Sequence, residues 1–163
     1  MREMFVESIR VSPVIYHRVV VLKEREGDRY LPIWIGPQEA NAIALKLQDI
    51  DTPRPMTHDL LASVFQALEA QVLRVVVSDL VDDTFFASIV VRLDNHQVEI
   101  DARPSDAIAL AVRLDTPIFA AEQVLDKAAM VPGEEEEGEE PSDEQLLAFR
   151  DFVDTLDLDD FGN

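Results

Sequence analysis

The densest group of polar side chains in the sequence lies at a predicted strand-to-helix corner. Six consecutive positions there hold Asp101, Arg103, Ser105 and Asp106, directly before an apolar helical pattern. A helix N-terminus offers unpaired N–H groups and a positive potential, which favour anions. Carboxylate, guanidinium and hydroxyl groups at such a corner are suited to binding phosphate or to acid–base chemistry. The same residues also have a structural interpretation, with Ser105 or Asp106 as the helix cap and Arg103 paired with Asp101.

The hydrophobic pattern around that corner predicts a short strand followed by an amphipathic helix. Val98 and Ile100 alternate with acidic residues, a period of two that is typical of a half-buried strand. Pro104 suits the first helical turn, and apolar residues follow at helical spacing as far as Leu114. The same patterns predict further strands at 4–11, 14–24, 30–35, 72–81 and 85–93, and further helices at 37–47, 57–68 and 121–129.

The two halves of this predicted order resemble each other. Each has a hairpin, a strand, a helix, a D-T-P break and a second helix, and the tetrapeptide A-I-A-L occurs once in each half. Two alignments stay open, one that superposes the tetrapeptides and one that sets Pro37 and Glu39 against Pro104 and Asp106. Neither half can bury its helices alone. The sequence therefore predicts an α+β fold: a single compact domain from a duplicated β-hairpin/strand plus two-helix unit, with an acidic C-terminal tail.

Composition restricts the class of protein. The 163 residues are 47% hydrophobic, which is typical of a globular domain with a real core. Cysteine is absent, which excludes a disulfide framework, a thiolate zinc site and a cysteine nucleophile. The N-terminus lacks the apolar core of a signal peptide, and no stretch approaches the ~18 apolar residues of a membrane span. We therefore expect a cytoplasmic protein with no membrane partner.

The net charge of −19 is unevenly distributed. From Pro132 onward there are 13 acidic residues against Arg150 alone, so this tail carries −12 and residues 1–131 carry −7. Nucleic-acid binding through counterion release needs a positive face, which this composition does not provide by itself. We predict a domain at 1–131, a disordered acidic linker at 132–141 and an acidic amphipathic helix and tail at 142–163. Two expectations for the tail stay open: that it binds a basic partner or its own domain, or that its helix stays solvated.

Three blocks of the sequence resemble those of one known family, in that family's order. They are L-P-I-W-I-G-P-Q-E-A-N-A-I-A at 31–44, R-P-M-T-H-D-L at 54–60 and D-A-R-P-S-D-A-I-A-L-A-V at 101–112. By these blocks the chain is identified as a member of the bifunctional nuclease family, with a match over 1–131. The resemblance implies a compact α+β domain, self-association to a homo-oligomer, and the nuclease activity on DNA and RNA that is attributed to plant members.

Phosphodiester hydrolysis would need a metal ion, a base that activates water, and cations for the developing charge. The candidate ligands for a divalent Mg²⁺ or Mn²⁺ ion are Glu39, Asp101 and Asp106. His58 is the candidate base or a further ligand, and Asp59 lies beside it in the first turn of the second predicted helix. The remaining candidates are Arg103 and Arg54, which would bind phosphate through two hydrogen bonds each, and Gln38, Asn41 and Ser105, which would orient substrate or water.

Each of these candidates also has a structural interpretation, which the sequence leaves open. Glu39 and Asp59 lie in first helical turns, where acidic residues favour the helix dipole. His58 is equally consistent with a solvated histidine or with one at the edge of the core. The sequence contains no P-loop, dinucleotide fingerprint, H-E-x-x-H or G-x-S-x-G motif, so it gives no support to a kinase, a Rossmann dehydrogenase, a zinc protease or an esterase.

Three functional hypotheses follow. The first is a metal-assisted nuclease whose site forms where the two repeated strand-to-helix corners meet, and carboxylates of Glu39, Asp101 and Asp106 on separate faces would contradict that site. The second is a non-enzymatic, oligomeric interaction or regulatory protein whose acidic tail binds a basic partner. The third is a small-ligand sensor that uses the corner from Arg103 to Ser105 as an anion pocket.

Overall fold

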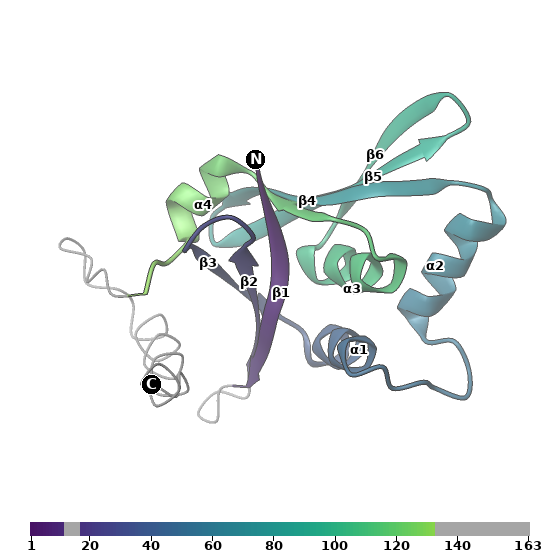
Figure 1. Ribbon diagram of the computed structural model, residues 1–163, viewed down its shortest axis with the longest axis horizontal. Coiled ribbons are helices and arrows are strands. Elements are labelled where there is room, and N and C mark those ends of the chain that lie inside the picture. The colour runs from purple at the N-terminus through teal and green to yellow at the C-terminus, as the bar shows by residue number, and fades with distance from the viewer. Residues whose placement is uncertain (12–16, 133–163) are drawn as a thin grey trace.

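The computed structural model of the protein describes residues 1–11 and 17–132 (Figure 1). Seven strands and four helices form within these ranges. The strands are β1 (Arg2–Val11), β2 (Arg18–Glu24), β3 (Tyr30–Ile35), β4 (Gln71–Val81), β5 (Thr84–Leu93), β6 (His96–Ala102) and β7 (Ile118–Ala120). The helices are α1 (Pro37–Leu47), α2 (Thr57–Ala67), α3 (Pro104–Leu114) and α4 (Glu122–Ala128).

All the strands in these ranges join one mixed sheet, in the order β3-β2-β1-β7-β4-β5-β6. The antiparallel meanders β1–β2–β3 and β4–β5–β6 lie on either side of β7. β7 runs antiparallel to β1 and parallel to β4, so it joins the two meanders into one sheet. The predicted single compact α+β domain is confirmed. The sequence predicted no strand at 118–120, because three residues between a proline and a helix are too few to show a period.

Helix α3 lies at the centre of the core and contacts α1, α2, β4 and β5. Figure 1 shows α1, α2 and α3 together on one side of β4 and β5. Pro104 begins α3 with a helical φ, and the chain leaves the helix at Asp115 in the left-handed region, with φ 51°. The buried residues of α3 are Pro104, Ser105, Ala107, Ile108, Ala109, Leu110 and Ala111.

Strand β6 lies at the edge of the sheet and is exposed from His96 to Asp101. Its apolar residues Val98 and Ile100 are 47% and 39% exposed. Figure 1 shows that the β5–β6 hairpin extends beyond the helices. The predicted half-burial of this strand is therefore wrong, because alternation along a strand does not reveal whether another layer covers it.

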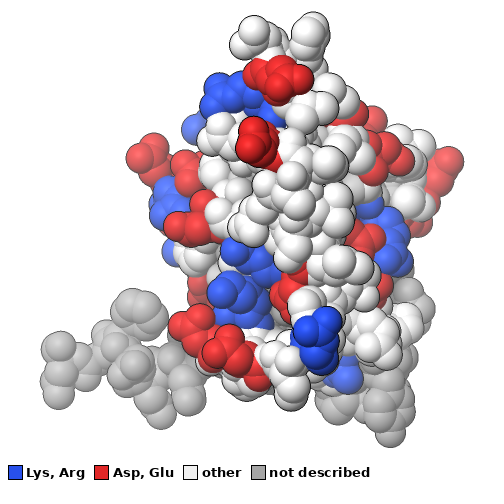
Figure 2. Space-filling view, turned by 90° about the vertical axis from the view of Figure 1, so that its right-hand side faces the viewer, with Lys and Arg blue, Asp and Glu red and all other residues white. Residues whose placement is uncertain are grey.

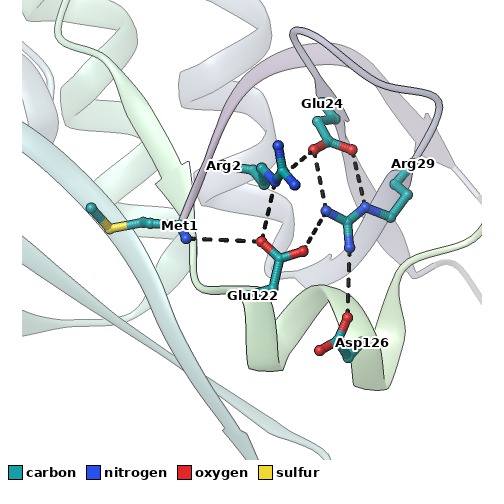
Figure 3. Close-up of polar contacts among 6 residues, drawn as sticks. All are labelled: Met1, Arg2, Glu24, Arg29, Glu122 and Asp126. Carbon is teal, nitrogen blue, oxygen red and sulfur yellow. Dashed lines mark hydrogen bonds and ion pairs between the residues drawn. The ribbon is translucent and has the colours of Figure 1, made fainter.

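A network of ion pairs connects β1 and the β2–β3 hairpin to α4 (Figure 3). The buried Glu24 accepts hydrogen bonds from Nε and Nη2 of Arg29 at 3.0 and 3.2 Å, and these bonds lower its pKa. The same Nη2 donates to Glu122 at 2.8 Å, and Arg2 donates to Glu122 through Nε at 3.2 Å. Because a buried carboxylate is stable only when it is paired, we interpret this network as structural.

Some of the predicted segments fall outside the described residues. They are the beginning of the predicted strand at 14–24, nearly all of the acidic linker at 132–141, and the whole C-terminal helix and tail at 142–163. Among the helices that the structure does describe, none has the length and the apolar run needed to cross a membrane.

Candidate functional site

The first turns of three helices come together in the helical layer. Glu39 is the third residue of α1, His58 the second residue of α2 and Asp106 the third residue of α3, and Arg103 directly precedes α3. Their side chains form one continuous series of contacts, from Glu39 to Arg103 to Asp106 to His58, which we call the helix-start cluster. The structure thus brings four of the predicted site residues together from three separate parts of the sequence.

Arg103 bridges the two carboxylates of the helix-start cluster. Its Nη2 donates to Oε1 of Glu39 at 2.9 Å, and its Nε donates to Oδ2 of Asp106 at 2.8 Å. The hydrogen bond to Asp106, followed by that to Glu39, raises the pKa of Arg103. The arginine side chain is 66% exposed, so part of its guanidinium stays open to solvent and to an incoming anion.

Asp106 positions the imidazole of His58. Its Oδ1 lies 2.9 Å from Nε2 of His58, whose side chain is 9% exposed. Burial opposes ionisation of Asp106, but hydrogen bonds from Arg103 and His58 outweigh this effect and hold its pKa below the usual value. An ionised carboxylate only accepts hydrogen bonds, so we assign the proton to Nε2. With that tautomer, Nδ1 is the ring nitrogen that carries a lone pair for a proton.

Asp59 faces away from the helix-start cluster and holds α2 against α3. Its Oδ1 accepts a hydrogen bond from Nε of Arg113 at 2.6 Å, and its Oδ2 accepts one from the N–H of Met56 at 2.8 Å. Arg113 is only 6% exposed and also donates to the carbonyl oxygens of Ala109 and Ala42, at 2.8 and 3.1 Å. Because all these groups are engaged, the geometry favours the structural interpretation of Asp59.

Sequence reasoning did not identify Arg113 as part of this arrangement. A basic residue in the last turn of a helix is common, since it interacts favourably with the helix dipole. No local pattern therefore distinguishes an arginine that is exposed from one that is buried against two other helices.

Asp101 does not join the helix-start cluster. Ile100 pairs with Ile89 across β5–β6, and Ile89 belongs to the core that packs against the helices. Side chains of successive strand residues point to opposite faces, so Asp101 lies on the face that points away from α3. It is also exposed and pairs in register with Ser88. The expectation that Asp101 meets Glu39 and Asp106 therefore fails, because the strand turns it to the other side of the sheet.

The other predicted substrate-binding residues make no side-chain hydrogen bond to the helix-start cluster within the described part of the chain. Gln38 and Asn41 are exposed on α1, and Arg54 is exposed in the segment between α1 and α2. Ser105 is buried as the second residue of α3, with 6% exposure. These positions leave Gln38, Asn41 and Arg54 accessible to a ligand and favour a packing role for Ser105.

The predicted metal ligands are not arranged as a metal site. Across 1–11 and 17–132 there is no group of three or more His, Cys, Asp or Glu side chains that could hold an ion. Glu39 and Asp106 both face the guanidinium of Arg103, and Asp101 lies across the sheet. A divalent cation between the two carboxylates would be repelled by the positive charge of Arg103. The residues in this arrangement therefore do not fit Mg²⁺ or Mn²⁺.

Comparison with known proteins identifies relatives of the chain. The family model described as the bifunctional nuclease domain matches residues 20–132. Proteins of Mycobacterium tuberculosis strains H37Rv and CDC 1551, both named as uncharacterized, are 38% identical over 164 residues, which cover 99% of this chain and 98% of theirs. Plant proteins named bifunctional nuclease 1, from Oryza sativa subsp. indica, and bifunctional nuclease, from Oryza minuta, are 27% identical over 114 residues. That match covers 68% of this chain but only 34% of the plant proteins.

The matched segment contains every residue of the helix-start cluster as well as the Asp59–Arg113 pair. It also spans more than half of the chain. The family is the same one that the three sequence blocks resemble. The chain therefore belongs to the bifunctional nuclease domain family.

Proposed function

We propose that this protein is a nuclease that hydrolyses phosphodiester bonds in DNA or RNA. The family and the names of the plant relatives support a nucleic-acid substrate. The observation that carries the proposal is the helix-start cluster. In it a buried histidine is hydrogen-bonded to an ionised aspartate, and a partly exposed arginine donates a hydrogen bond to the same aspartate. A base, a group that orients it and an anion-binding cation are thus placed together.

In the proposed reaction, Nδ1 of His58 takes a proton from a water molecule while the water oxygen bonds to phosphorus. The P–O bond to one sugar breaks, and the leaving sugar oxygen is protonated by solvent. Asp106 keeps the imidazole in the required tautomer and stabilises the imidazolium that forms. Arg103 donates to a non-bridging phosphate oxygen, and Glu39 fixes the orientation of that guanidinium.

A requirement for Mg²⁺ or Mn²⁺ stays a prediction. The reaction proposed above uses Arg103 for charge stabilisation and assigns no step to a metal ion. Cleavage assays with Mn²⁺ and with chelator decide between the two possibilities, because only a metal-assisted reaction is lost in chelator.

The test of nuclease function compares two histidine variants of the full chain on labelled single- and double-stranded DNA and RNA. His58→Gln removes the proposed base, and we expect cleavage to fall by about 10²-fold or more. His96→Gln is the matched control, because His96 is exposed on β6 and does not contact the helix-start cluster. Asp106→Asn and Asp101→Asn form a second matched pair, and only the first is expected to lose activity.

Equal cleavage by wild type and His58→Gln would contradict the proposal, as would equal losses in Asp106→Asn and Asp101→Asn. Thermal unfolding of each variant separates loss of activity from loss of the fold.

A second candidate function is that of an oligomeric interaction protein. Leu60, Val64 and Leu68 follow one another at intervals of four along α2 and its end, and they are 58%, 44% and 63% exposed. Figure 2 looks onto the side of the molecule on which α2 lies in Figure 1, and it shows a broad uncharged area there. This apolar row supports association with a second copy of the chain. Sedimentation velocity tests it, since Val64→Glu should shift the protein to monomer and an unchanged coefficient would exclude this contact.

We also propose that the two halves of the domain arose by duplication. Two three-stranded meanders flank β7, and each is followed by a helix that begins with a proline and has an acid as its third residue. These features support the alignment that pairs Pro37 and Glu39 with Pro104 and Asp106. The acidic tail lies outside the described residues, so its binding to a basic partner stays a prediction.

A further inference from the structure

A pocket of about 350 Å³ opens between the end of α1, the segment that follows it and the first turn of α2, on the side of α2 that faces away from the helix-start cluster. Asp59 and Arg113 form part of its lining. Asp59 directly follows His58, and successive residues of a helix point roughly 100° apart. The first turn of α2 therefore contacts the helix-start cluster with one side chain and this pocket with the next.

The charges of this pocket are opposite in sign to the net charge of the domain. Lys46 and Arg54 both line it, both are exposed, and neither makes a side-chain hydrogen bond or ion pair within the described ranges. Arg113 and Asp59 neutralise each other through their ion pair. Two cations are thus left against the single carboxylate of Asp51, which makes the pocket suited to an anion.

The rest of the lining adds two further kinds of contact. Ile50, Pro55 and Met56 add apolar side chains to the wall, against which a nucleobase can pack. Asp51 offers a carboxylate that accepts hydrogen bonds from sugar hydroxyls or from a base amino group. Cations, an acceptor and an apolar wall together match a nucleotide better than a bare phosphate ion. The volume is also within the range of pockets that bind small molecules, about 300–1,000 Å³.

We propose that this pocket binds one nucleotide of the nucleic-acid strand whose phosphodiester bond reaches His58. Lys46 and Arg54 bind its phosphate, Asp51 its sugar or base donors, and the apolar wall its base. This inference rests on the proposed nuclease function and extends it, because it gives the site a second contact with the strand beyond the bond that is cleaved.

Isothermal titration calorimetry of the full chain tests the proposal with adenosine 5′-monophosphate, adenosine and inorganic phosphate as probes. We expect the monophosphate to bind at least tenfold more tightly than either of its parts. Arg54→Gln and Lys46→Gln should each weaken this binding by about tenfold, since each removes one charge-assisted hydrogen bond. The matched control is Arg92→Gln, because Arg92 is exposed on β5 and does not line the pocket. This control should bind the nucleotide as wild type does.

Three results would overturn the inference: no binding of the monophosphate, equal binding of inorganic phosphate, or unchanged binding by both pocket variants. Failure of the nuclease proposal is distinguishable from these. If the chain cleaves nucleic acid and binds no mononucleotide, only the pocket inference fails. If it binds the mononucleotide through Lys46 and Arg54 but cleaves nothing, the pocket stands and the nuclease proposal fails.

Discussion

Arg103 and Glu39 are 64 positions apart in the sequence, yet Nη2 of the arginine donates to Oε1 of the glutamate at 2.9 Å. This contact joins the residue that precedes α3 to the first turn of α1, where two positive helix ends lie close together. Glu39 and Asp106 offset that positive potential, and Arg103 in turn keeps the two carboxylates from repelling each other. The same three residues therefore stabilise the junction of the helices and orient the guanidinium that we propose binds phosphate.

Arg103→Lys should lower cleavage of nucleic acid by about tenfold to 100-fold, because a single ammonium group cannot reproduce the planar fork that contacts two carboxylates and a phosphate. Its stability should change by no more than about 1 kcal/mol, since the side chain is largely exposed. Steady-state cleavage of a labelled oligonucleotide and urea unfolding measure the two effects. A lysine variant with full activity would exclude this role for Arg103.

Arg113→Ala should destabilise the fold by about 3 kcal/mol, because it removes the buried partner of Asp59 together with the side-chain hydrogen bonds to two helix carbonyl oxygens. Urea unfolding at neutral pH measures this loss. Arg103→Ala is the comparison variant, and its loss should be at most about 1 kcal/mol because the Arg103 side chain is largely exposed and solvent screens its charge. Equal losses in the two variants would show that burial does not distinguish the two ion pairs.

Acid should destabilise the protein through Asp59 and Asp106. In the folded state the pKa of each carboxyl lies below its usual value of 3.8, since hydrogen bonds from neighbouring groups outweigh the effect of burial. The unfolded chain then binds more protons as the pH falls, so this stabilisation is complete above about pH 5 and is lost as the pH falls through the folded pKa. Urea unfolding at several pH values tests this, and the stability difference between wild type and Asp106→Asn should shrink in acid. A constant difference would contradict the linkage.

Local pattern was enough to predict most of the helices and strands. Pro37 and Pro104 begin helices because a proline ring sets a helical φ and its missing N–H is not needed in the first turn. Alternating apolar residues predicted the strands, because the two-residue period of a strand can be seen in neighbouring residues alone. Strand β7 is the exception, since it is too short for any period and forms only between two existing strands.

The sequence by itself determined which groups lie at the helix starts, namely the acids, Arg103 and His58, because these positions depend on neighbouring residues alone. Only the tertiary structure decided which of them meet. His58 reaches Asp106 over 48 positions and Arg113 reaches Asp59 over 54, while Asp101, only two residues before Arg103, points to the other face of the sheet. Helix packing and strand register set these outcomes. Both depend on the burial of apolar side chains that are far apart in the chain, so the spacing of neighbouring residues does not predict them.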